Sequence, residues 1–349
     1  MLSKDMDFLK KLPTPEELVK VYPLGKAMTK RKQLFDREIK KIFSGESEKF
    51  LLNIGPCSAD RMDAVLEYAA RLGEIQKEVA ENILIVPRVY TSKPRTIGKG
   101  YMGMIHQPYI GQGEDLSMGI AAVRNVHRQV VQETGLFTSD ELLYPETIHY
   151  LADLLGYAVI GARSVENQQH RLVASGLNIP VGLKNPINGS INVMLNAIET
   201  AQHPHHFIFN GWEVMSKGNE FAHGVLRGFL EEGGKAVRNC DYEHLGEICN
   251  RFASRNVENP AVVVDCNHSN SDKQYLRQID NAMEVLDMMK VYAPIRKLVK
   301  GLMIESYLED GNQSVDDGVY GKSITDPCLG WEKSKQLIYD INEKLEELK

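Results

Sequence analysis

The sequence lacks the apolar segments that mark membrane and exported proteins. No run of apolar residues is long enough to span a bilayer. The first fifteen residues, MLSKDMDFLKKLPTP, also lack the apolar stretch of a signal peptide. Apolar residues make up 43% of the chain and charged residues 25%, which are ordinary values for a soluble globular protein. We therefore expect no membrane partner.

Cysteine is scarce. The five cysteines are odd in number and have no regular spacing, which excludes a disulfide scaffold and favours a reducing compartment. We expect the protein to be cytoplasmic. A chain of 349 residues can bury a sufficient core without disulfides.

Excess positive charge is absent too, because the net charge is -6, which argues against a nucleic-acid partner. Cationic side chains nevertheless recur where short apolar runs end, or in the loops that follow. They are Arg88, Lys93, Arg95, Arg163, Lys184 and Arg227. A basic cluster inside an acidic protein indicates a small, highly anionic ligand.

The apolar runs alternate with helical patterns along most of the chain. We predict strands near 51–56, 83–89, 136–142, 157–163, 180–185, 205–210, 261–267 and 299–306. Such alternation is typical of parallel βαβ units, whose strands are buried on both faces. Eight units predict an α/β protein, a (β/α)8 TIM barrel with extensions. The polar residues at the strand ends then lie where active sites of such barrels are found.

We divide the chain into an N-terminal arm, residues 1–49, and a catalytic barrel, residues 50–349. The arm should contain a helix from about Thr29 to Phe43 that ends at Gly45 and packs outside the barrel. The Gly-rich stretch 211–235 predicts a hairpin insertion after the sixth strand.

Four residues form a candidate metal site: Cys57, His268, Glu305 and Asp326. The first three end predicted strands one, seven and eight, which are adjacent in a closed barrel, and the fourth lies in the following loop. A thiolate, an imidazole and two carboxylates suit Mn, Fe, Co or Zn better than Mg or Ca. Position alone leaves open that the four are unrelated, with the carboxylates paired to the basic cluster.

The KPRT loop, residues 93–96, is a candidate phosphate cradle. It places Lys93, Arg95 and Thr96 in one tight turn whose backbone is fixed by Pro94. Arg binds phosphate bidentately and Lys supplies a point charge. A solvated loop with ordinary salt bridges is the alternative for any one of these residues. Glu141, at the end of the third strand, could pair with a nearby cation.

All of these residues except Glu141 lie in motifs that resemble the class I 3-deoxy-D-arabino-heptulosonate 7-phosphate (DAHP) synthases, the microbial type with an N-terminal arm. The motifs are GPCSAD (55–60), PRVYTSKPRT (87–96), GARSVENQQHR (161–171), GLKN (182–185), LRG (226–228), DCNHSNSDKQ (265–274), IESYLEDGNQ (304–313) and YGKSITDPCLGWE (320–332). The resemblance covers nearly the whole chain in the same order.

The resemblance implies a metal-dependent transferase that condenses phosphoenolpyruvate with D-erythrose 4-phosphate to give DAHP and phosphate. This is the first step of the shikimate pathway of aromatic amino acid biosynthesis. Cys57, His268, Glu305 and Asp326 match the ligands of one divalent ion, and Asp326 is also expected to face the substrates. Arg88, Arg163, Lys184 and Arg227 match the phosphoenolpyruvate contacts, with Glu141 beside them. Lys93, Arg95 and Thr96 match the erythrose 4-phosphate contacts.

Catalytic roles are also implied for some of these residues. Lys93 could reach both substrates and is a candidate proton donor, while Glu141 and a metal-bound water are both candidates to activate the attacking water. Family habit predicts a homodimer or homotetramer, and one aromatic amino acid as a possible inhibitor.

The sequence departs from the family pattern at several positions, and none of these departures removes a catalytic match. Ser164-Val165-Glu166-Asn167 replaces the usual Thr-Thr-Glu-Ser, NPINGS follows Lys184, the sixth-strand insertion is shorter and the arm begins late. Two alternatives stay open. One is a synthase that uses another aldose phosphate, such as arabinose 5-phosphate, against which KPRT argues. The other is a non-catalytic barrel that senses aromatic amino acids, against which the complete ligand set argues.

Overall fold

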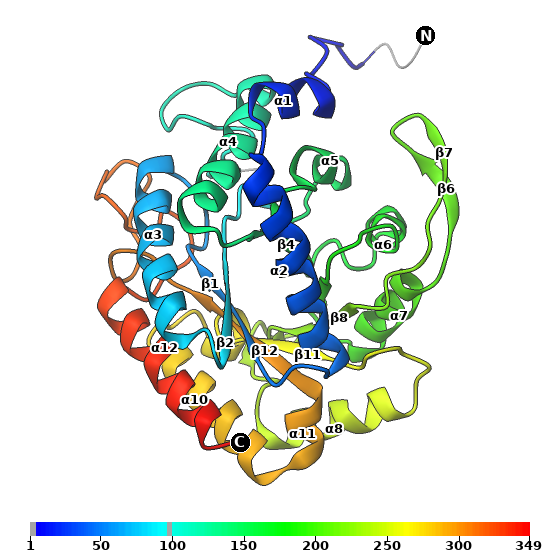
Figure 1. The fold of residues 1–349 in the computed structure, drawn as a ribbon, viewed down its shortest axis with the longest axis vertical. Helices are drawn as coiled ribbons and strands as arrows, with labels where there is room; N and C mark the ends of the chain where they lie inside the picture. The colour runs from blue at the N-terminus through cyan, green and yellow to red at the C-terminus, as the bar shows by residue number, and fades with distance from the viewer. Residues whose placement is uncertain (1–4, 96–99) are drawn as a thin grey trace.

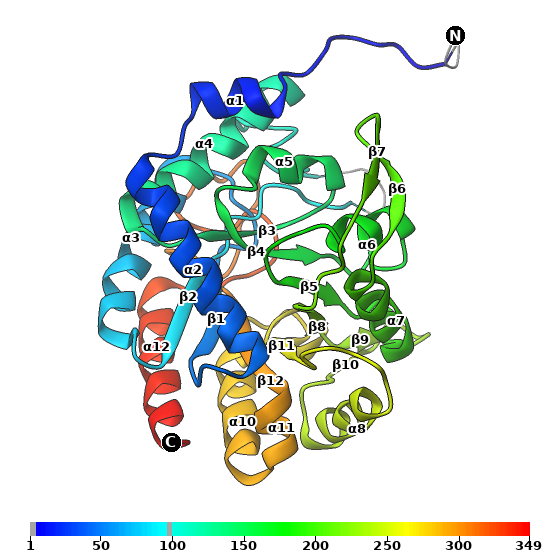
Figure 2. The same cartoon turned by 45° about the vertical axis from the view of Figure 1, so that its right-hand side comes forward.

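The computed structural model describes residues 5–95 and 100–349 and shows a parallel barrel surrounded by helices (Figure 1 and Figure 2). The barrel strands are β1 (Phe50–Gly55), β2 (Ile83–Pro87), β3 (Thr138–Glu141), β4 (Leu155–Ile160), β5 (Val181–Lys184), β8 (Ala222–Leu226), β11 (Val262–Asp265) and β12 (Val299–Glu305). They lie in the order β2-β1-β12-β11-β8-β5-β4-β3. A bridge between Arg88 and Ser139 joins β2 to β3, the two ends of this order, and so closes the barrel. The predicted (β/α)8 barrel is confirmed.

The strands are apolar because helices cover their outer faces and side chains fill the interior. Every residue of β1, β2, β4, β8 and β11 is buried. Helices surround them, and the longer helices are amphipathic with one buried face each. The surrounding helices are α3 (Met62–Val79), α4 (Leu116–Thr134), α5 (Ile148–Leu151), α6 (Gln168–Ala174), α7 (Ile191–Gln202), α8 (Tyr242–Ala253), α9 (His268–Ser271), α10 (Arg277–Val291), α11 (Ala293–Leu298) and α12 (Trp331–Glu346).

The sixth barrel strand was predicted at the wrong place. The segment near 205–210 forms β6 (His206–Phe209), which pairs antiparallel with β7 (Trp212–Met215) outside the barrel, and β8 takes the sixth position. Asn210 and Gly211 between the paired strands have φ of 49° and 77°, as a two-residue hairpin turn requires. A second hairpin, β9 (Phe229–Leu230) with β10 (Ala236–Val237), follows β8, so a hairpin is present after the sixth strand. The stretch 211–235 predicted for it is wrong, because that stretch contains β8 itself.

The N-terminal arm contains α1 (Pro15–Val21) and α2 (Lys26–Ser44), and the predicted helix is confirmed, with Gly45 at φ 80° after its last turn. Helix α2 crosses the end of the barrel where the strands begin (Figure 1). The Phe35 ring centre lies 5.3 Å from that of Phe137, and Phe43 lies 4.1 Å from His223. The arm thus covers the barrel end opposite the predicted site. Within the described ranges, no helix is long and apolar enough to cross a membrane.

A buried carboxyl ties together the loops that follow β1 and β12. Asp60 is 5% exposed and accepts a hydrogen bond of 3.1 Å from the Tyr307 hydroxyl. Burial raises the pKa of Asp60 to about 6, above its ordinary value of 3.8. Because the folded-state pKa is raised, ionisation of Asp60 lowers stability progressively as the pH rises from about 4 to 6, and the loss persists above that range.

We predict that Asp60→Asn, which keeps the acceptor but cannot ionise, stabilises the protein mainly at neutral pH. The gain in unfolding free energy at pH 7.5 should exceed the gain at pH 4.5 by about 2 kcal/mol. Urea unfolding at both pH values measures it, with Asp63→Asn as the control because its side chain is 59% exposed. A gain that is equal at both pH values would contradict the prediction.

Candidate active site

The predicted site residues gather where the barrel strands end. Glu141, Lys184 and Glu305 are the last residues of β3, β5 and β12, and Arg88 directly follows β2. Cys57 comes two residues after β1. In a parallel barrel these ends open on one face, so residues far apart in sequence converge there.

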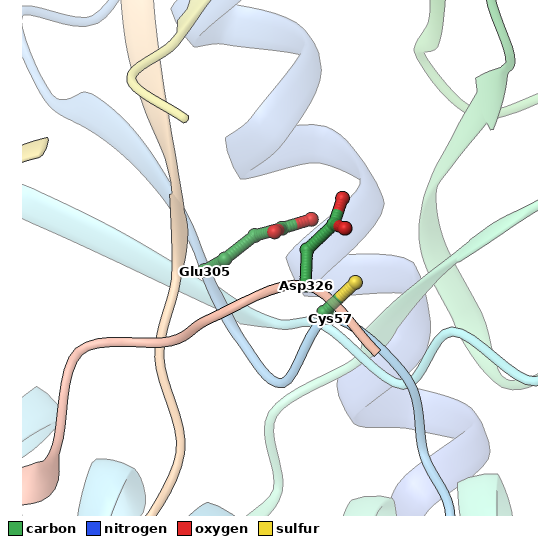
Figure 3. A group of neighbouring side chains, drawn as sticks. All are labelled: Cys57, Glu305 and Asp326. Atoms are coloured by element: carbon green, nitrogen blue, oxygen red, sulfur yellow. The ribbon is translucent and has the colours of Figure 1, made fainter. Parts of the chain in front are cut away.

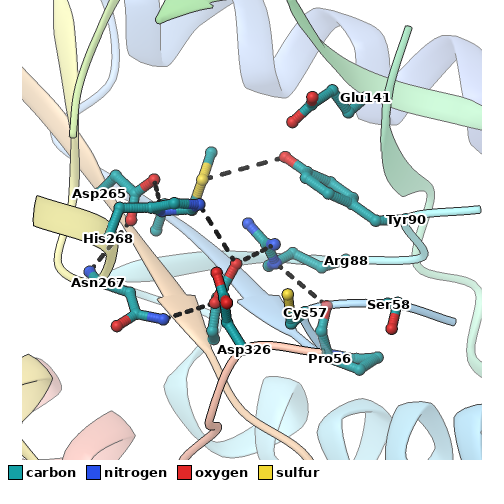
Figure 4. A network of polar contacts seen from close by, with 12 residues as sticks. Pro56, Cys57, Ser58, Arg88, Tyr90, Glu141, Asp265, Asn267, His268 and Asp326 are labelled. Carbon is teal, nitrogen blue, oxygen red and sulfur yellow. Dashed lines mark hydrogen bonds and ion pairs between the residues drawn. The ribbon is translucent and has the colours of Figure 1, made fainter. Parts of the chain in front are cut away.

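Three of the four predicted metal ligands point toward one another (Figure 3). The Cys57 sulfur and one carboxylate oxygen each of Glu305 and Asp326 lie within 4.8 Å of one another. His268 lies at the edge of this group, with Nε2 3.9 Å from Glu305 Oε1. Its Nδ1 is 2.8 Å from Asp265 Oδ2, a contact that orients the imidazole (Figure 4).

This donor set fits a borderline divalent cation. It combines one thiol, two carboxylates and one imidazole, whereas Mg and Ca prefer sites made of oxygen alone. Burial raises the pKa of the Cys57 thiol, and the neighbouring Glu305 raises it further. Because only the thiolate is a good ligand, a cation that binds there must displace the thiol proton.

We predict that Zn²⁺ affinity rises with pH, because Cys57 loses a proton on binding. At pH values below the raised thiol pKa, the loss of this one proton raises the Zn²⁺ affinity by up to about tenfold per pH unit. Competition with a chromophoric chelator at pH 6.5 and 7.5 measures the slope. Cys57→Ser should bind more weakly and with a shallower pH dependence, and an unchanged slope in that variant would rule out the thiol as the source.

Arg88 contacts this group through Glu305 and keeps one nitrogen without a partner among the described residues. Its Nη2 lies 3.0 Å from Glu305 Oε1, and its guanidinium stacks 3.9 Å from the centre of the Tyr90 ring. Burial opposes the charge of Arg88, but Tyr90 and Glu305 outweigh that effect and raise its pKa. Its Nη1 is buried and finds no hydrogen-bond partner within the described ranges. A buried donor left unsatisfied is costly, so this nitrogen favours an anionic ligand.

Lys184 lies between two carboxylates. Its Nζ is 3.4 Å from Asp265 Oδ2 and 3.7 Å from Glu141 Oε2. Burial opposes ionisation of Glu141, but Lys184 and Lys93 hold the pKa of that carboxyl below its ordinary value. Gly161 makes room for it, because a Cβ there would lie 2.3 Å from Glu141 Oε1. Asp265 was missed in the sequence, although it ends the apolar run VVVD.

Lys93 contacts Cys57, one of the three converging candidate metal ligands. Its Nζ contacts the carbonyl oxygen of Cys57 and lies 3.5 Å from the Cys57 sulfur. Burial opposes its charge, but Cys57 and Glu305 raise the pKa of Lys93, so it carries a proton. Arg95 donates to the Tyr101 carbonyl oxygen at 2.8 Å. Thr96 lies outside the described residues.

Arg227 provides a second unsatisfied donor. It follows β8, and its Nη1 is buried with no hydrogen-bond partner among the residues that the structure describes. Burial lowers the pKa of Arg227; Asp265 opposes this effect, and the nearby cation Arg163 adds to it. Two neighbouring cations of this kind favour an anionic ligand.

Comparison with known proteins accounts for this arrangement. Residues 26–338 match the model of the DAHP synthetase I family. The chain belongs to that family. It is 36% identical over 342 residues to the Phe-sensitive phospho-2-dehydro-3-deoxyheptonate aldolase of Escherichia coli, covering 95% of this chain and 94% of the relative. The Tyr-sensitive enzyme of the same organism is 35% identical over 345 residues, covering 96% and 93%.

A solved structure agrees over the whole chain. The phospho-2-dehydro-3-deoxyheptonate aldolase of Francisella tularensis superposes with a TM-score of 0.91 and 32% sequence identity, covering 99% of this chain and 100% of that one. The predicted family, reaction and enzyme class are confirmed: this is a DAHP synthase, a transferase of aromatic amino acid biosynthesis. The two alternative functions lose their support.

Proposed function

We propose that this DAHP synthase works with one divalent ion, Mn, Fe, Co or Zn, held by Cys57, His268, Glu305 and Asp326. The observation that carries the proposal is the convergence of three ligand atoms within 4.8 Å, from residues as far apart in the sequence as Cys57 and Asp326. A bound ion supplies Lewis acidity toward the aldehyde oxygen of erythrose 4-phosphate. The imidazole of His268, oriented by Asp265, supplies the fourth donor.

We assign phosphoenolpyruvate to the cationic side of the site. This substrate carries a phosphate and a carboxylate, which match the cations Arg88, Arg163, Lys184 and Arg227. The free donors of Arg88 and Arg227 support the assignment, because a buried guanidinium is stabilised when an anion completes its hydrogen bonds.

Erythrose 4-phosphate is assigned to the KPRT loop, with Arg95 and Thr96 toward its phosphate. C3 of phosphoenolpyruvate attacks the aldehyde carbon, and protonated Lys93 donates its proton to the oxygen that becomes an alkoxide. Water then adds to C2, and inorganic phosphate leaves with cleavage of the C–O bond. Glu141 is held ionised beside Lys184 and can accept the proton of that water. One water is consumed, and DAHP and phosphate are the products.

We predict that Arg95→Ala raises the KM for erythrose 4-phosphate, whereas Lys184→Ala raises the KM for phosphoenolpyruvate. Each lost charge-assisted contact should weaken the binding of its own substrate by about 1.5–3 kcal/mol, which is roughly tenfold or more. Initial rates with each substrate varied in turn measure both constants. Arg61→Ala is the control, because this arginine pairs with the exposed Asp63 and is not one of the proposed substrate contacts. If the two substitutions exchanged their effects, the substrate assignment would be wrong.

We propose that the arm, residues 1–49, and the β6–β7 hairpin form an interface with a second copy of the chain. The start of the arm, before α2, and the hairpin project from the barrel (Figure 1 and Figure 2). Phe8 and Leu9 of the arm are 77% and 90% exposed, and Ile208 and Trp212 of the hairpin are 78% and 73% exposed. Apolar side chains gathered in this way are typical of a surface that a partner covers. A homodimer or homotetramer buries them.

A pocket beside this hairpin is the proposed site of an aromatic amino acid inhibitor. It has a volume of about 580 Å³ and is lined by side chains that include Ile148, Val173, Phe207, Phe209 and Val214. An apolar pocket of this size with a few polar groups suits an aromatic amino acid. Two of the relatives are named Phe-sensitive and Tyr-sensitive, which supports feedback inhibition of this chain by one such amino acid.

We predict that removing residues 1–14 weakens both the assembly and the inhibition, because the arm supplies part of the interface beside the pocket. Sedimentation should show smaller species at low concentration, and the most effective of Phe, Tyr and Trp should lose potency at least about tenfold. The basal rate without inhibitor is the internal control. Equal sensitivity of the full and shortened chains would exclude these residues from the switch.

A further inference from the structure

A buried polar network between β3 and α4 lies behind the active site, and no sequence pattern predicted it. At its centre is Asp140, which is 3% exposed. Its Oδ1 accepts hydrogen bonds from the backbone nitrogens of Thr91, at 3.0 Å, and Glu141, at 2.8 Å. Its Oδ2 accepts a 2.5 Å hydrogen bond from the Thr91 hydroxyl. One carboxylate thus holds two segments of the site at once.

His127 of α4 supports this carboxylate from the other side. Its Nε2 lies 3.3 Å from Asp140 Oδ2, and its Nδ1 is 2.6 Å from the Thr138 hydroxyl. Both His127 and Thr138 are fully buried. The surface between a helix and a barrel strand is ordinarily apolar, and burying a carboxylate there costs several kcal/mol unless donors surround it. Three donors, the Thr91 nitrogen and hydroxyl and the Glu141 nitrogen, bind this carboxylate, and the His127 ring contacts it as well.

The segment that Asp140 holds leads directly to Lys93. Thr91 is bound on both sides, because its carbonyl oxygen also accepts from the Ile105 nitrogen at 3.2 Å. Two residues later, the Lys93 nitrogen donates to the Met102 carbonyl oxygen at 3.1 Å. The backbone is therefore fixed before and at Lys93, and its side chain reaches the carbonyl oxygen of Cys57. The Glu141 nitrogen donates to the same oxygen, Asp140 Oδ1, as the Thr91 nitrogen.

We propose that Asp140 is a positioning residue for the reaction. Through Thr91 it sets the placement of Lys93, and through the Glu141 nitrogen it sets the placement of the carboxylate beside Lys184. His127 holds Asp140 in the orientation that serves both. The inference rests on the proposed role of Lys93 as proton donor, because fixing Thr91 matters only if the position of the Lys93 ammonium group matters. Small misplacements of a reacting group cost much of the rate.

Thr91 offers the cleanest test, because Val has the same shape without the hydroxyl. We expect Thr91→Val to lower kcat by about 10- to 100-fold and to leave the KM for phosphoenolpyruvate within about twofold. Thr91→Ser keeps the hydroxyl and should retain at least about half of the kcat. Metal content, measured by mass spectrometry, should equal that of the wild type in both variants. A Thr91→Val enzyme with full kcat would overturn the proposal.

A second pair of variants probes the carboxylate itself. Asp140→Asn keeps an acceptor for the two backbone nitrogens and should lose less kcat than Asp140→Ala. The control is Tyr157→Phe, which removes a buried hydrogen bond of 2.8 Å to His223 near the barrel end that α2 covers. It should lower the thermal unfolding midpoint without changing kcat. If Asp140→Asn and Thr91→Val behave like this control, losing stability alone, the network is only structural and the proposal is wrong.

A double substitution tests whether Thr91 acts through Lys93. Lys93→Arg should keep a residual rate, and adding Thr91→Val to it should slow that rate by less than about twofold, because both changes act on the same group. A full additional loss would mean that Thr91 does not act through Lys93. If Lys93→Met retained wild-type turnover, the proposed proton donor would be wrong. If Lys93→Met were inactive while Thr91→Val were fully active, only the positioning proposal would fail.

Discussion

Arg88 and Glu305 form an ion pair on which the rest of the site depends. Arg88 directly follows β2 and Glu305 ends β12, the neighbours of β1 on either side, and each of the two residues is 1% exposed. Breaking a buried pair of this kind by removing one partner is costly, because the other charge is left uncompensated. Glu305 is thereby held beside the other proposed metal ligands, while the second guanidinium nitrogen of Arg88 has no hydrogen-bond partner among the described residues. The proposed metal and phosphoenolpyruvate positions thus share this ion pair.

The other proposed ligands are each held by a side chain outside the metal group. Asp265 contacts His268, Lys273 lies 3.0 Å from Asp326, and Lys93 lies 3.5 Å from the Cys57 sulfur. Glu305 has a further partner in Asn267, whose amide donates to Oε2 at 2.5 Å. Such outer contacts fix ligand orientation and tune the charge of the site. They also explain how acids and bases can be packed this densely in an acidic protein, since most of these charges are matched by a neighbour.

The sequence predicted the parts of this structure that rest on periodicity and on strand ends. Eight strand–helix units and the convergence of Cys57, Glu305 and Asp326 follow from patterns visible along the chain. The place of the sixth strand could not be read in this way, because HFIF and AHGVL are both short apolar runs. The Asn210–Gly211 turn was the signal that the first belongs to a hairpin. The contacts of Asp140 with Thr91 and His127 depend on side-chain packing between distant segments, which no local pattern encodes.

The central claim is that the cluster of Cys57, His268, Glu305 and Asp326 holds the ion that makes the condensation possible. Phosphate release after chelation and reloading tests it most directly. The chelated enzyme should release none; reloading with Mn²⁺, Co²⁺ or Zn²⁺ should restore release only when phosphoenolpyruvate and erythrose 4-phosphate are both present. Cys57→Ser treated in the same way should not recover, and arabinose 5-phosphate should not replace erythrose 4-phosphate. Full phosphate release after verified removal of the metal would contradict this account.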